Sequence, residues 1–300
     1  MSVLWFSHEE CLEHVAGANH PERPDRLRAV LAGVERSAFA DALLRRVPTP
    51  APRSAIERVH PVGLFPGLEA IAAQGGGRID ADTVMNSHSF TAALLAAGAG
   101  LDAIEALEAG EADSAFCAVR PPGHHATRSQ SMGFCLFNSV AVAARSLTDR
   151  GERVVIVDID AHHGNGTQDI FYDDPNVLFI SMHQSPCYPG SGALGEVGLG
   201  AGKGFTVNLP MRPGTEGDTY RAAVDEVVLS AVDRFGPTWL LISAGFDGHR
   251  DDPITDLGLS SGDYGNLVAR LLPLAPAGRR LIFLEGGYDL AALTNSTVAT

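Results

Sequence analysis

A chain of 300 residues, 45% of them hydrophobic and 19% charged, is long and apolar enough to bury a sizeable core, which excludes an intrinsically disordered protein. The formal net charge of -14 argues against a general nucleic-acid binder and mildly favours cationic substrates, although an ordinary acidic protein would carry the same charge. Four cysteines without a CxxC pair indicate neither a disulfide framework nor a thiolate zinc site.

The N-terminus lacks the basic and long apolar parts of a signal peptide. No uninterrupted apolar run reaches the ~18 residues of a membrane span, so we expect a cytoplasmic protein without membrane association. No linker-like segment divides the chain, and we predict a single domain over residues 1–300. A homo-oligomer is compatible with these features.

The first elements are expected to be a strand and a helix. Residues 3–6 are apolar enough for a short strand. The prolines around Arg23 stand where a helix can begin, with acidic residues near its positive end and an apolar stripe beyond. Arg23 and Arg26 could anchor an internal carboxylate or be solvated, and the sequence favours neither reading.

The next part of the chain is predicted to be largely helical. Residues 54–74 fit a helix apart from two prolines, and the glycines of residues 74–78 indicate a flexible break. Residues 91–107 form a second helix, whose many Ala and Gly residues would let it pack closely against a sheet. We expect residues 54–89 to shape the rim of a site and the assembly.

Five apolar runs then lead directly into residues capable of chemistry. Stretches long enough for a crossover helix separate most of them, for example residues 138–147, 220–235 and 261–272. We therefore predict a parallel α/β sheet whose carboxyl-terminal edge gathers the reactive groups into one site. The runs are residues 115–119, 154–159, 177–182, 239–244 and 281–284.

The second of these runs ends in charged groups that indicate a metal site. If the strand continues through Asp158, Asp160 and His162, all three side chains share one face. Their desolvation next to a core strand would be costly unless an ion compensates it. Zinc in a hydrolase takes about three such ligands and keeps a position open for water. Asp160 and His162 can supply two, and Asp247, after another run, can supply the third.

Other side chains are candidates for proton transfer and charge stabilisation. His124 and His125 follow Pro-Pro-Gly, and the pKa of an imidazole can be tuned for proton transfer near neutrality. Asp158 could hydrogen-bond one of them and set its tautomer if Asp160 binds the metal. Tyr288 follows two glycines and can donate a hydrogen bond to a carbonyl oxygen and to the oxyanion that develops there.

The motifs together resemble the zinc-dependent histone deacetylase family. Asn165 and the start His20-Pro-Glu-Arg-Pro are similar to the class II branch and its bacterial relatives, including the acetylpolyamine amidohydrolases. The resemblance implies an arginase/deacetylase-like three-layer fold, with a central, mostly parallel sheet of about eight strands, and hydrolysis of acetylated amines. It rests on Arg120-Pro-Pro-Gly-His-His, Gly133-Phe-Cys, Asp158-Ile-Asp-Ala-His-His-Gly-Asn-Gly, Ser181-Met-His, Tyr188-Pro-Gly, Ala244-Gly-Phe-Asp, Asp252-Pro and Glu285-Gly-Gly-Tyr.

Carried over by motif, the resemblance assigns catalytic roles. It makes His125 the general base and then acid, with His124 as its electrostatic partner and an alternative proton donor. Asp158 would orient His124. Asn165 stands where other branches carry a second Asp, so His125 should be less strongly biased towards imidazolium. Tyr288 would polarise the acetyl carbonyl. The implied ligands of the single zinc ion are Asp160, His162 and Asp247.

The resemblance also implies substrate contacts. The Gly133 carbonyl would accept the amide hydrogen, and Phe134 and Tyr188 would flank the acyl tunnel. In this branch the Tyr188 position is commonly Phe, so the hydroxyl would narrow or polarise the tunnel. Gly287 would allow close approach of the substrate. Ile254 stands where a polyamine specialist would be expected to carry an acidic residue, which slightly favours acyl-lysine or a range of small amides.

Two structural K⁺ or Na⁺ sites are implied as well. The first would use the Asp158 and Ser181 side chains with the carbonyls of Asp160, His162 and Met182. The second would use carbonyls near Phe171, Asp174 and Val177.

Two other readings remain open. A dinuclear manganese hydrolase of the arginase type would need more carboxylates, but Gly164 and His249 stand at the corresponding positions. A catalytically idle protein that binds acetylated amines would have no need of His124, His125 and Tyr288.

Overall fold

The computed structural model describes residues 2–61 and 63–300. Met1 of the predicted domain and Val62 of the predicted helical stretch 54–74 lie outside the described residues. A second, small sheet consists of β3 (Gly76–Arg78) and β4 (Val84–Asn86). The main sheet contains β1 (Val3–Phe6), β2 (Leu43–Arg46), β5 (Ser114–Cys117), β6 (Val154–Asp158), β7 (Val177–Gln184), β8 (Thr206–Met211), β9 (Trp239–Ala244) and β10 (Arg280–Leu284).

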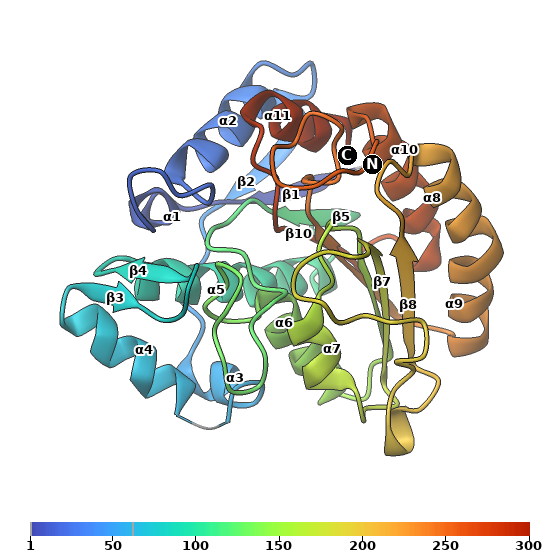
Figure 1. Ribbon diagram of the computed structural model, residues 1–300, viewed down its shortest axis with the longest axis horizontal. Coiled ribbons are helices and arrows are strands. Elements are labelled where there is room, and N and C mark those ends of the chain that lie inside the picture. The colour runs from blue at the N-terminus through green and yellow to red at the C-terminus, as the bar shows by residue number, and fades with distance from the viewer. Residues whose placement is uncertain (1, 62) are drawn as a thin grey trace.

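The main sheet has the order β2-β1-β5-β10-β9-β6-β7-β8, and every neighbouring pair is parallel (Figure 1). Every residue of β6, β7 and β9 is buried, because a parallel strand covered on both faces has no polar side. These strands, with β5 and β10, are the five predicted apolar runs. The predicted parallel α/β sheet of about eight strands is confirmed.

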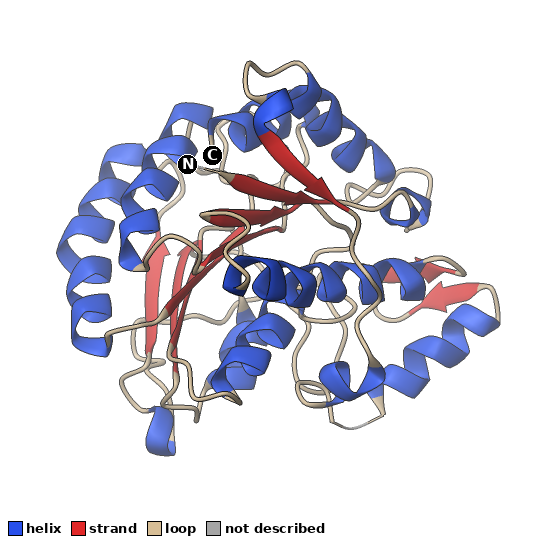
Figure 2. Cartoon of the chain, turned by 180° about the vertical axis from the view of Figure 1, so that it is seen from behind, coloured by secondary structure: helices blue, strands red, loops and turns tan. Residues whose placement is uncertain are grey.

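Helices cover both faces of the sheet and complete three layers, as Figure 2 shows from behind. One layer contains α2, α8, α9, α10 and α11, and the other contains α5, α6 and α7. The helices are α1 (Glu10–Glu13), α2 (Pro24–Glu35), α3 (Arg53–Glu57), α4 (Leu64–Ala73), α5 (Ser89–Glu108), α6 (Ser139–Thr148), α7 (Asn165–Phe171), α8 (Gly217–Ala223), α9 (Leu229–Phe235), α10 (Ser261–Leu271) and α11 (Leu290–Ala299). A π-helical turn, Val224–Val228, joins α8 to α9, and 3-10 turns occupy Ala40–Ala42, Gly200–Gly202 and Leu272–Leu274.

The sequence did not predict the two edge strands or the small sheet. β2 is mostly exposed, and β8 contains Pro210. Proline has no N–H group, and an edge strand tolerates it because the N–H groups on its outer side pair with no other strand. The predicted flexible break at 74–78 is wrong, because residues 76–78 pair with β4. A Cβ on Gly76 would lie 2.2 Å from the Met85 carbonyl oxygen. Glycine here permits close strand approach.

Helix α5 is long and apolar enough to cross a membrane by composition, which the sequence analysis did not register. However, 61% of its most apolar window is buried, and the helix packs against α6, β5 and β10. A Cβ on Gly100 would lie 2.6 Å from the Phe283 ring, so small residues set its distance from the sheet. Such contacts are those of a core helix, as predicted for residues 91–107.

A buried histidine, His60, predicts that the folded protein loses stability in acid. His60 Nδ1–H donates to the Thr127 carbonyl at 2.8 Å, and its Nε2 accepts from the Asn138 N–H at 3.0 Å. Burial lowers the pKa of His60 to about 4. Below pH ~6.5 the unfolded chain takes up this proton before the folded protein does, so stability falls as pH falls. Between about pH 6.5 and 4 the free energy of unfolding should drop by about 3 kcal/mol from this residue.

Urea unfolding at pH 7 and at about pH 4.5 measures this effect. In His60→Gln the side-chain amide does not titrate. The free energy of unfolding should therefore depend less on pH than in the wild type, even if the variant is less stable at every pH. An equal loss of stability in the variant and the wild type would contradict the assignment.

Candidate metal centre and active site

Three of the predicted reactive groups, His125, His162 and Tyr288, line one cavity of about 340 Å³ at the carboxyl-terminal edge of the sheet. The loops after β5, β6, β7, β9 and β10 all contribute to its wall. A cavity of similar size, about 330 Å³, lies between β1, β5 and α11, and its described lining residues include no titratable side chain. The first cavity, which we call the site cavity, is lined by Asp82, His125, Gly133, Phe134, His162, Cys187, Tyr188, Ile254 and Tyr288.

The predicted zinc ligands lie together beside the site cavity. Potential ligand atoms of Asp160, His162 and Asp247 are all within 4.8 Å of one another. His162 Nδ1 is 3.1 Å from Asp160 Oδ1 and 3.1 Å from Asp247 Oδ2. A Cβ on Gly286 would be 2.1 Å from Asp247 Oδ2 and 2.6 Å from Asp160 Oδ2. Glycine is therefore needed where the two carboxylates converge.

The donor set of these three residues fits a divalent cation. Asp160 and Asp247 are fully buried carboxylates that share one imidazole nitrogen. Although burial opposes the charge, Asp247 and Asp160 raise the pKa of His162 well above its ordinary value. Burial and the neighbouring Asp160 also raise the pKa of Asp247. Two carboxylate oxygens and one imidazole nitrogen are ligands typical of a catalytic zinc site.

His124 lies against the carboxylate predicted to orient it. Its Nδ1–H donates to Asp158 Oδ2 at 2.9 Å, and its Nε2 is 3.8 Å from Asp160 Oδ2. Burial opposes the charge, but Asp160 and Asp158 raise the pKa of His124 to about 10. The two carboxylates therefore favour the protonated form of this buried imidazole.

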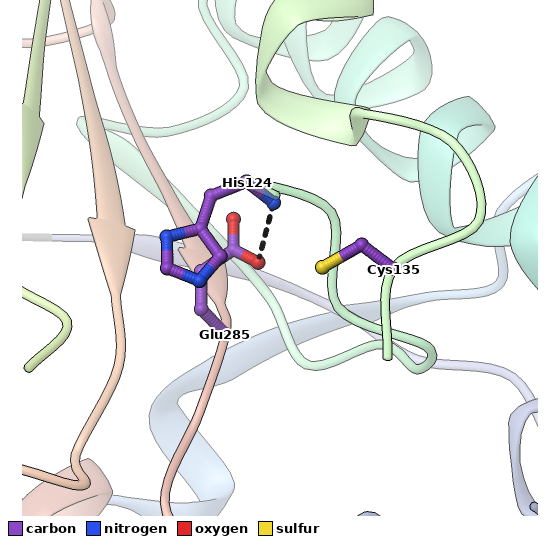
Figure 3. A group of neighbouring side chains, drawn as sticks. All are labelled: His124, Cys135 and Glu285. Carbon is purple, nitrogen blue, oxygen red and sulfur yellow. Dashed lines mark hydrogen bonds between the residues drawn. The ribbon is translucent and has the colours of Figure 1, made fainter. Parts of the chain in front are cut away.

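Glu285, a residue that the sequence analysis did not assign, holds the main chain in front of the two histidines. Its carboxylate accepts from the N–H groups of Gly123 (2.7 Å) and His124 (3.2 Å), and from the Ser243 hydroxyl (3.1 Å). The dashed line in Figure 3 marks its bond to His124. The signal in the sequence was a carboxylate directly after the buried run 281–284.

Cys135 lies close to His124 and Glu285, and the three could hold a metal ion by spacing alone (Figure 3). The Cys135 thiol, however, donates to the Gly133 carbonyl at 3.4 Å, and burial raises its pKa well above the ordinary value. A protonated thiol is a poor metal ligand. Since Glu285 already accepts three hydrogen bonds, we assign this group a structural role.

His125 has the environment of a neutral imidazole. Its Nδ1–H donates to Asn165 Oδ1 at 2.7 Å, which leaves Nε2 as a proton acceptor. Burial and then the charges of His124 and His162 lower the pKa of His125 well below its ordinary value. A Cβ on Gly133 would lie 2.5 Å from the imidazole, so only glycine lets this loop pack against it.

The predicted aromatic walls lie around this histidine. The Tyr188 ring meets His125 edge to face with centroids 5.1 Å apart, and the Phe134 ring meets Tyr288 in the same way at 5.9 Å. Burial raises the pKa of Tyr288 well above its ordinary value, so its hydroxyl keeps its proton. Ile254 lies at the cavity wall with 38% of its surface exposed.

The structure separates the two arginines whose roles were open. Arg26 is fully buried and donates to Glu22 at 3.0 Å, to the Gly287 carbonyl at 2.6 Å and to the Glu285 carbonyl at 2.5 Å. Arg23 is largely solvated beside Asp25.

Gly287, predicted to contact substrate, does not line the site cavity among the described residues. Its carbonyl instead binds Arg26.

Two lining residues were missed. Asp82 lies on the loop between β3 and β4, within the segment expected to shape the rim, and Cys187 precedes Tyr188. Burial and then Asp80 raise the pKa of Asp82. Only its position between rim elements could have indicated Asp82.

The residues of the predicted monovalent cation sites have other partners. The Ser181 hydroxyl is 2.9 Å from His183 Nδ1, and the Met182 carbonyl accepts from Tyr220 at 3.4 Å. Phe171, Asp174 and Val177 lie where α7 leads into β7. Both sites stay predictions.

Comparisons with known proteins cover nearly the whole chain. A model of the histone deacetylase domain matches residues 20–300. A probable deacetylase from Archaeoglobus fulgidus is 40% identical over 289 residues, which cover 94% of this chain and 80% of the relative. The histone deacetylase-like amidohydrolase of Pseudomonas aeruginosa is 36% identical over 312 residues, covering 96% and 82%. The crystal structure of the HDA15 HD domain matches with a TM-score of 0.95 at 37% identity, over 99% of this chain and 86% of that chain.

Proposed function

Because the chain belongs to the histone deacetylase family, we propose that it is a zinc-dependent amidohydrolase that removes acetyl or other short acyl groups from amines such as acyl-lysine and releases acetate. The family membership confirms the resemblance and supports deacetylase or amidohydrolase activity. Beyond this activity, the proposal names zinc as the metal ion and acyl-lysine as the substrate. One observation carries it: His162, which belongs to the group Asp160, His162 and Asp247, lines the same cavity as His125 and Tyr288.

The residues of the chain divide the chemistry among them. His125 Nε2 takes a proton from the attacking water, because Asn165 holds the other nitrogen protonated. Tyr288 donates a hydrogen bond to the acyl oxygen as negative charge develops on it. His125 then returns its proton to the leaving amine, and His124, whose ring lies beside that of His125, is its electrostatic partner and the alternative donor. The amide C–N bond breaks, and acetate and a free amine leave.

Asp160, His162 and Asp247 would hold the zinc ion. When bound there, zinc supplies the Lewis acidity that polarises the acyl carbonyl and lowers the pKa of water. A second metal of the arginase type would need a carboxylate at position 164. A Cβ on Gly164 would lie 2.1 Å from Asp158 Oδ2, so such a side chain would displace Asp158 from His124. This supports one metal ion per chain.

The cavity rim supports acyl-lysine as the first substrate class and acetylpolyamines as the second. Ile254 presents an apolar surface to the aliphatic part of a substrate. Asp82, however, places a carboxylate in the same wall, where it would attract a leaving amine that carries a second positive charge.

We also propose a cytoplasmic location, a possible homo-oligomer, and no direct contact with nucleic acid or membrane.

A substrate panel tests the proposal. Initial rates of the zinc-loaded protein should be measured on fluorogenic acetyl-lysine, acetyl-lysine peptides, acetylputrescine and longer acyl-lysines. If the protein hydrolyses none of these substrates, the result would support the reading of a catalytically idle protein that only binds acetylated amines.

Asp82→Asn separates the two substrate classes. The variant should raise KM for acetylputrescine about two- to fivefold, because a partly exposed ion pair contributes up to about 1 kcal/mol. KM for an uncharged acetyl-lysine amide should stay unchanged. Glu57→Gln, which removes an exposed carboxylate on α3 outside the cavity wall, is the matched control. Equal effects of Asp82→Asn on both substrates would show that Asp82 does not select charge.

A further inference from the structure

The segment that carries Tyr288 has its main-chain groups bound from several directions. The Gly286 N–H donates to Asp160 Oδ2 at 2.9 Å, and Phe246 N–H donates to the Gly286 carbonyl at 3.0 Å. Arg26 holds the carbonyls on either side of Gly286. These contacts fix the residues before Tyr288, and the N–H group of the tyrosine itself needs a separate partner.

That partner is Asp252, on the loop after β9. Its Oδ2 accepts from the Tyr288 N–H at 2.7 Å and from the Asp289 N–H at 3.3 Å. Its Oδ1 accepts from the Ile254 N–H at 3.1 Å. Asp252 is 7% exposed, whereas the side chain of its neighbour Asp251 is 66% exposed. One buried carboxylate therefore joins the tyrosine segment to the cavity rim.

The bond to Ile254 has a local explanation, but the other two do not. An aspartate that accepts from the N–H two residues ahead forms an ordinary Asx turn. Tyr288 and Asp289, however, lie 36 and 37 residues away in the sequence, on the loop after β10. Burial and then Asp247 raise the pKa of Asp252 to about 7, so the restraint rests on the placement of its two oxygens. One oxygen accepts from Ile254 and the other from Tyr288 and Asp289, whereas an amide side chain offers a single acceptor oxygen.

The position of the Tyr288 hydroxyl depends on this restraint. Among the described residues, the hydroxyl has no hydrogen-bond partner, and the ring meets the edge of Phe134 and the Arg26 guanidinium, 4.9 Å from the ring centroid. Because these ring contacts do not anchor the hydroxyl, its position follows that of the Tyr288 main chain. We propose that Asp252 is a positioning residue that fixes the main chain of Tyr288, and so places its hydroxyl at the acyl oxygen, while fixing the rim at Ile254.

The test rests on the proposed function and uses Asp252→Asn, which replaces one of the two acceptor oxygens by an NH2 group at nearly constant volume. We expect kcat to fall about tenfold or more, since a displacement of about 1 Å can cost up to about a hundredfold. KM should change less than about twofold, and metal content should not change. Asp251→Asn is the matched control, with wild-type kinetics expected. Kinetics of Asp252→Asn equal to those of the wild type would overturn the proposal.

A double-mutant cycle separates positioning from general damage. In a Tyr288→Phe background the hydroxyl is already absent, so Asp252→Asn should reduce kcat by less than about twofold more. The same fold-loss in both backgrounds would show that Asp252 does not act through Tyr288. Should Asp252→Asn fail to fold, Asp252→Glu keeps both acceptor oxygens but displaces them by one methylene, and the same non-additivity is expected.

Hydrogen exchange gives a readout that does not need activity. The Tyr288 and Asp289 amides should be protected in the wild type and exchange at least about tenfold faster in Asp252→Asn, with the Gly286 amide as an internal reference. Unprotected wild-type amides, or equal exchange in both proteins, would overturn the inference. An inactive wild type that still shows this pattern would instead remove the proposed function and leave the positioning intact.

Discussion

Removal of bound metal by a chelator is expected to reduce amide hydrolysis at least about a thousandfold, and added Zn²⁺ should restore it. The reason is the donor set, in which two buried carboxylates and one imidazole converge within 4.8 Å. A Lewis acid in such a site contributes several kcal/mol to transition-state stabilisation, and each 1.36 kcal/mol is worth about tenfold in rate. Metal content and kcat/KM should be measured on the same sample before and after chelation.

Asp247→Ala should lose both metal and activity. Asp251→Asn, which changes an exposed carboxylate nearby, should keep both. A metal-free sample that retains full activity would contradict the metal-dependent proposal. Two metal equivalents per active chain would favour the dinuclear reading.

Tyr288→Phe is expected to lower kcat at least about tenfold, since removal of one oxyanion donor typically costs about a hundred- to a thousandfold. The hydroxyl keeps its proton because burial raises the pKa of Tyr288 well above its ordinary value. It can therefore donate throughout the neutral range. The ring contacts with Phe134 and Arg26 do not involve the hydroxyl, so folding and metal content should be unchanged. Steady-state kinetics and metal analysis on the purified variant measure these effects.

Tyr188→Phe is the matched control for that experiment, because it removes a hydroxyl from the same cavity. We expect a change of less than about threefold, since Tyr188 is 37% exposed and its ring packs against His125. Unchanged turnover in Tyr288→Phe would remove the assigned role. A larger loss in Tyr188→Phe than in Tyr288→Phe would assign the donor function to Tyr188.

The buried strands could be predicted because each is a short run of apolar residues with polar residues at its end. β6 and β9 begin and end close to the predicted limits. β2 and β8 could not be found in this way, because an edge strand needs no continuous apolar run and its partner is chosen by the fold. The hairpin of β3 and β4 was missed because glycine serves close approach as well as flexibility.

The candidate site was predictable where a motif joins neighbouring residues, as in Asp160 and His162. Asp82 and Cys187 carry no such pattern, and only the folded rim brings them to the cavity. Arg26 was undecidable for a related reason. Two of its partners, the carbonyls of Glu285 and Gly287, lie 259 and 261 residues away, and Glu22 is close to both arginines in the sequence, so the local sequence does not distinguish Arg26 from Arg23.

The place of β10 in the sheet has a consequence for synthesis on the ribosome. β10 is made last among the strands, yet it lies between β5 and β9 at the centre of the sheet. The two outer groups of strands, β2-β1-β5 and β9-β6-β7-β8, share no hydrogen bonds until β10 inserts between them. Glu285, Gly286 and Tyr288 follow this strand directly. A nascent chain therefore cannot complete its central sheet, or the site cavity wall that Tyr288 forms, until about residue 290 has left the exit tunnel.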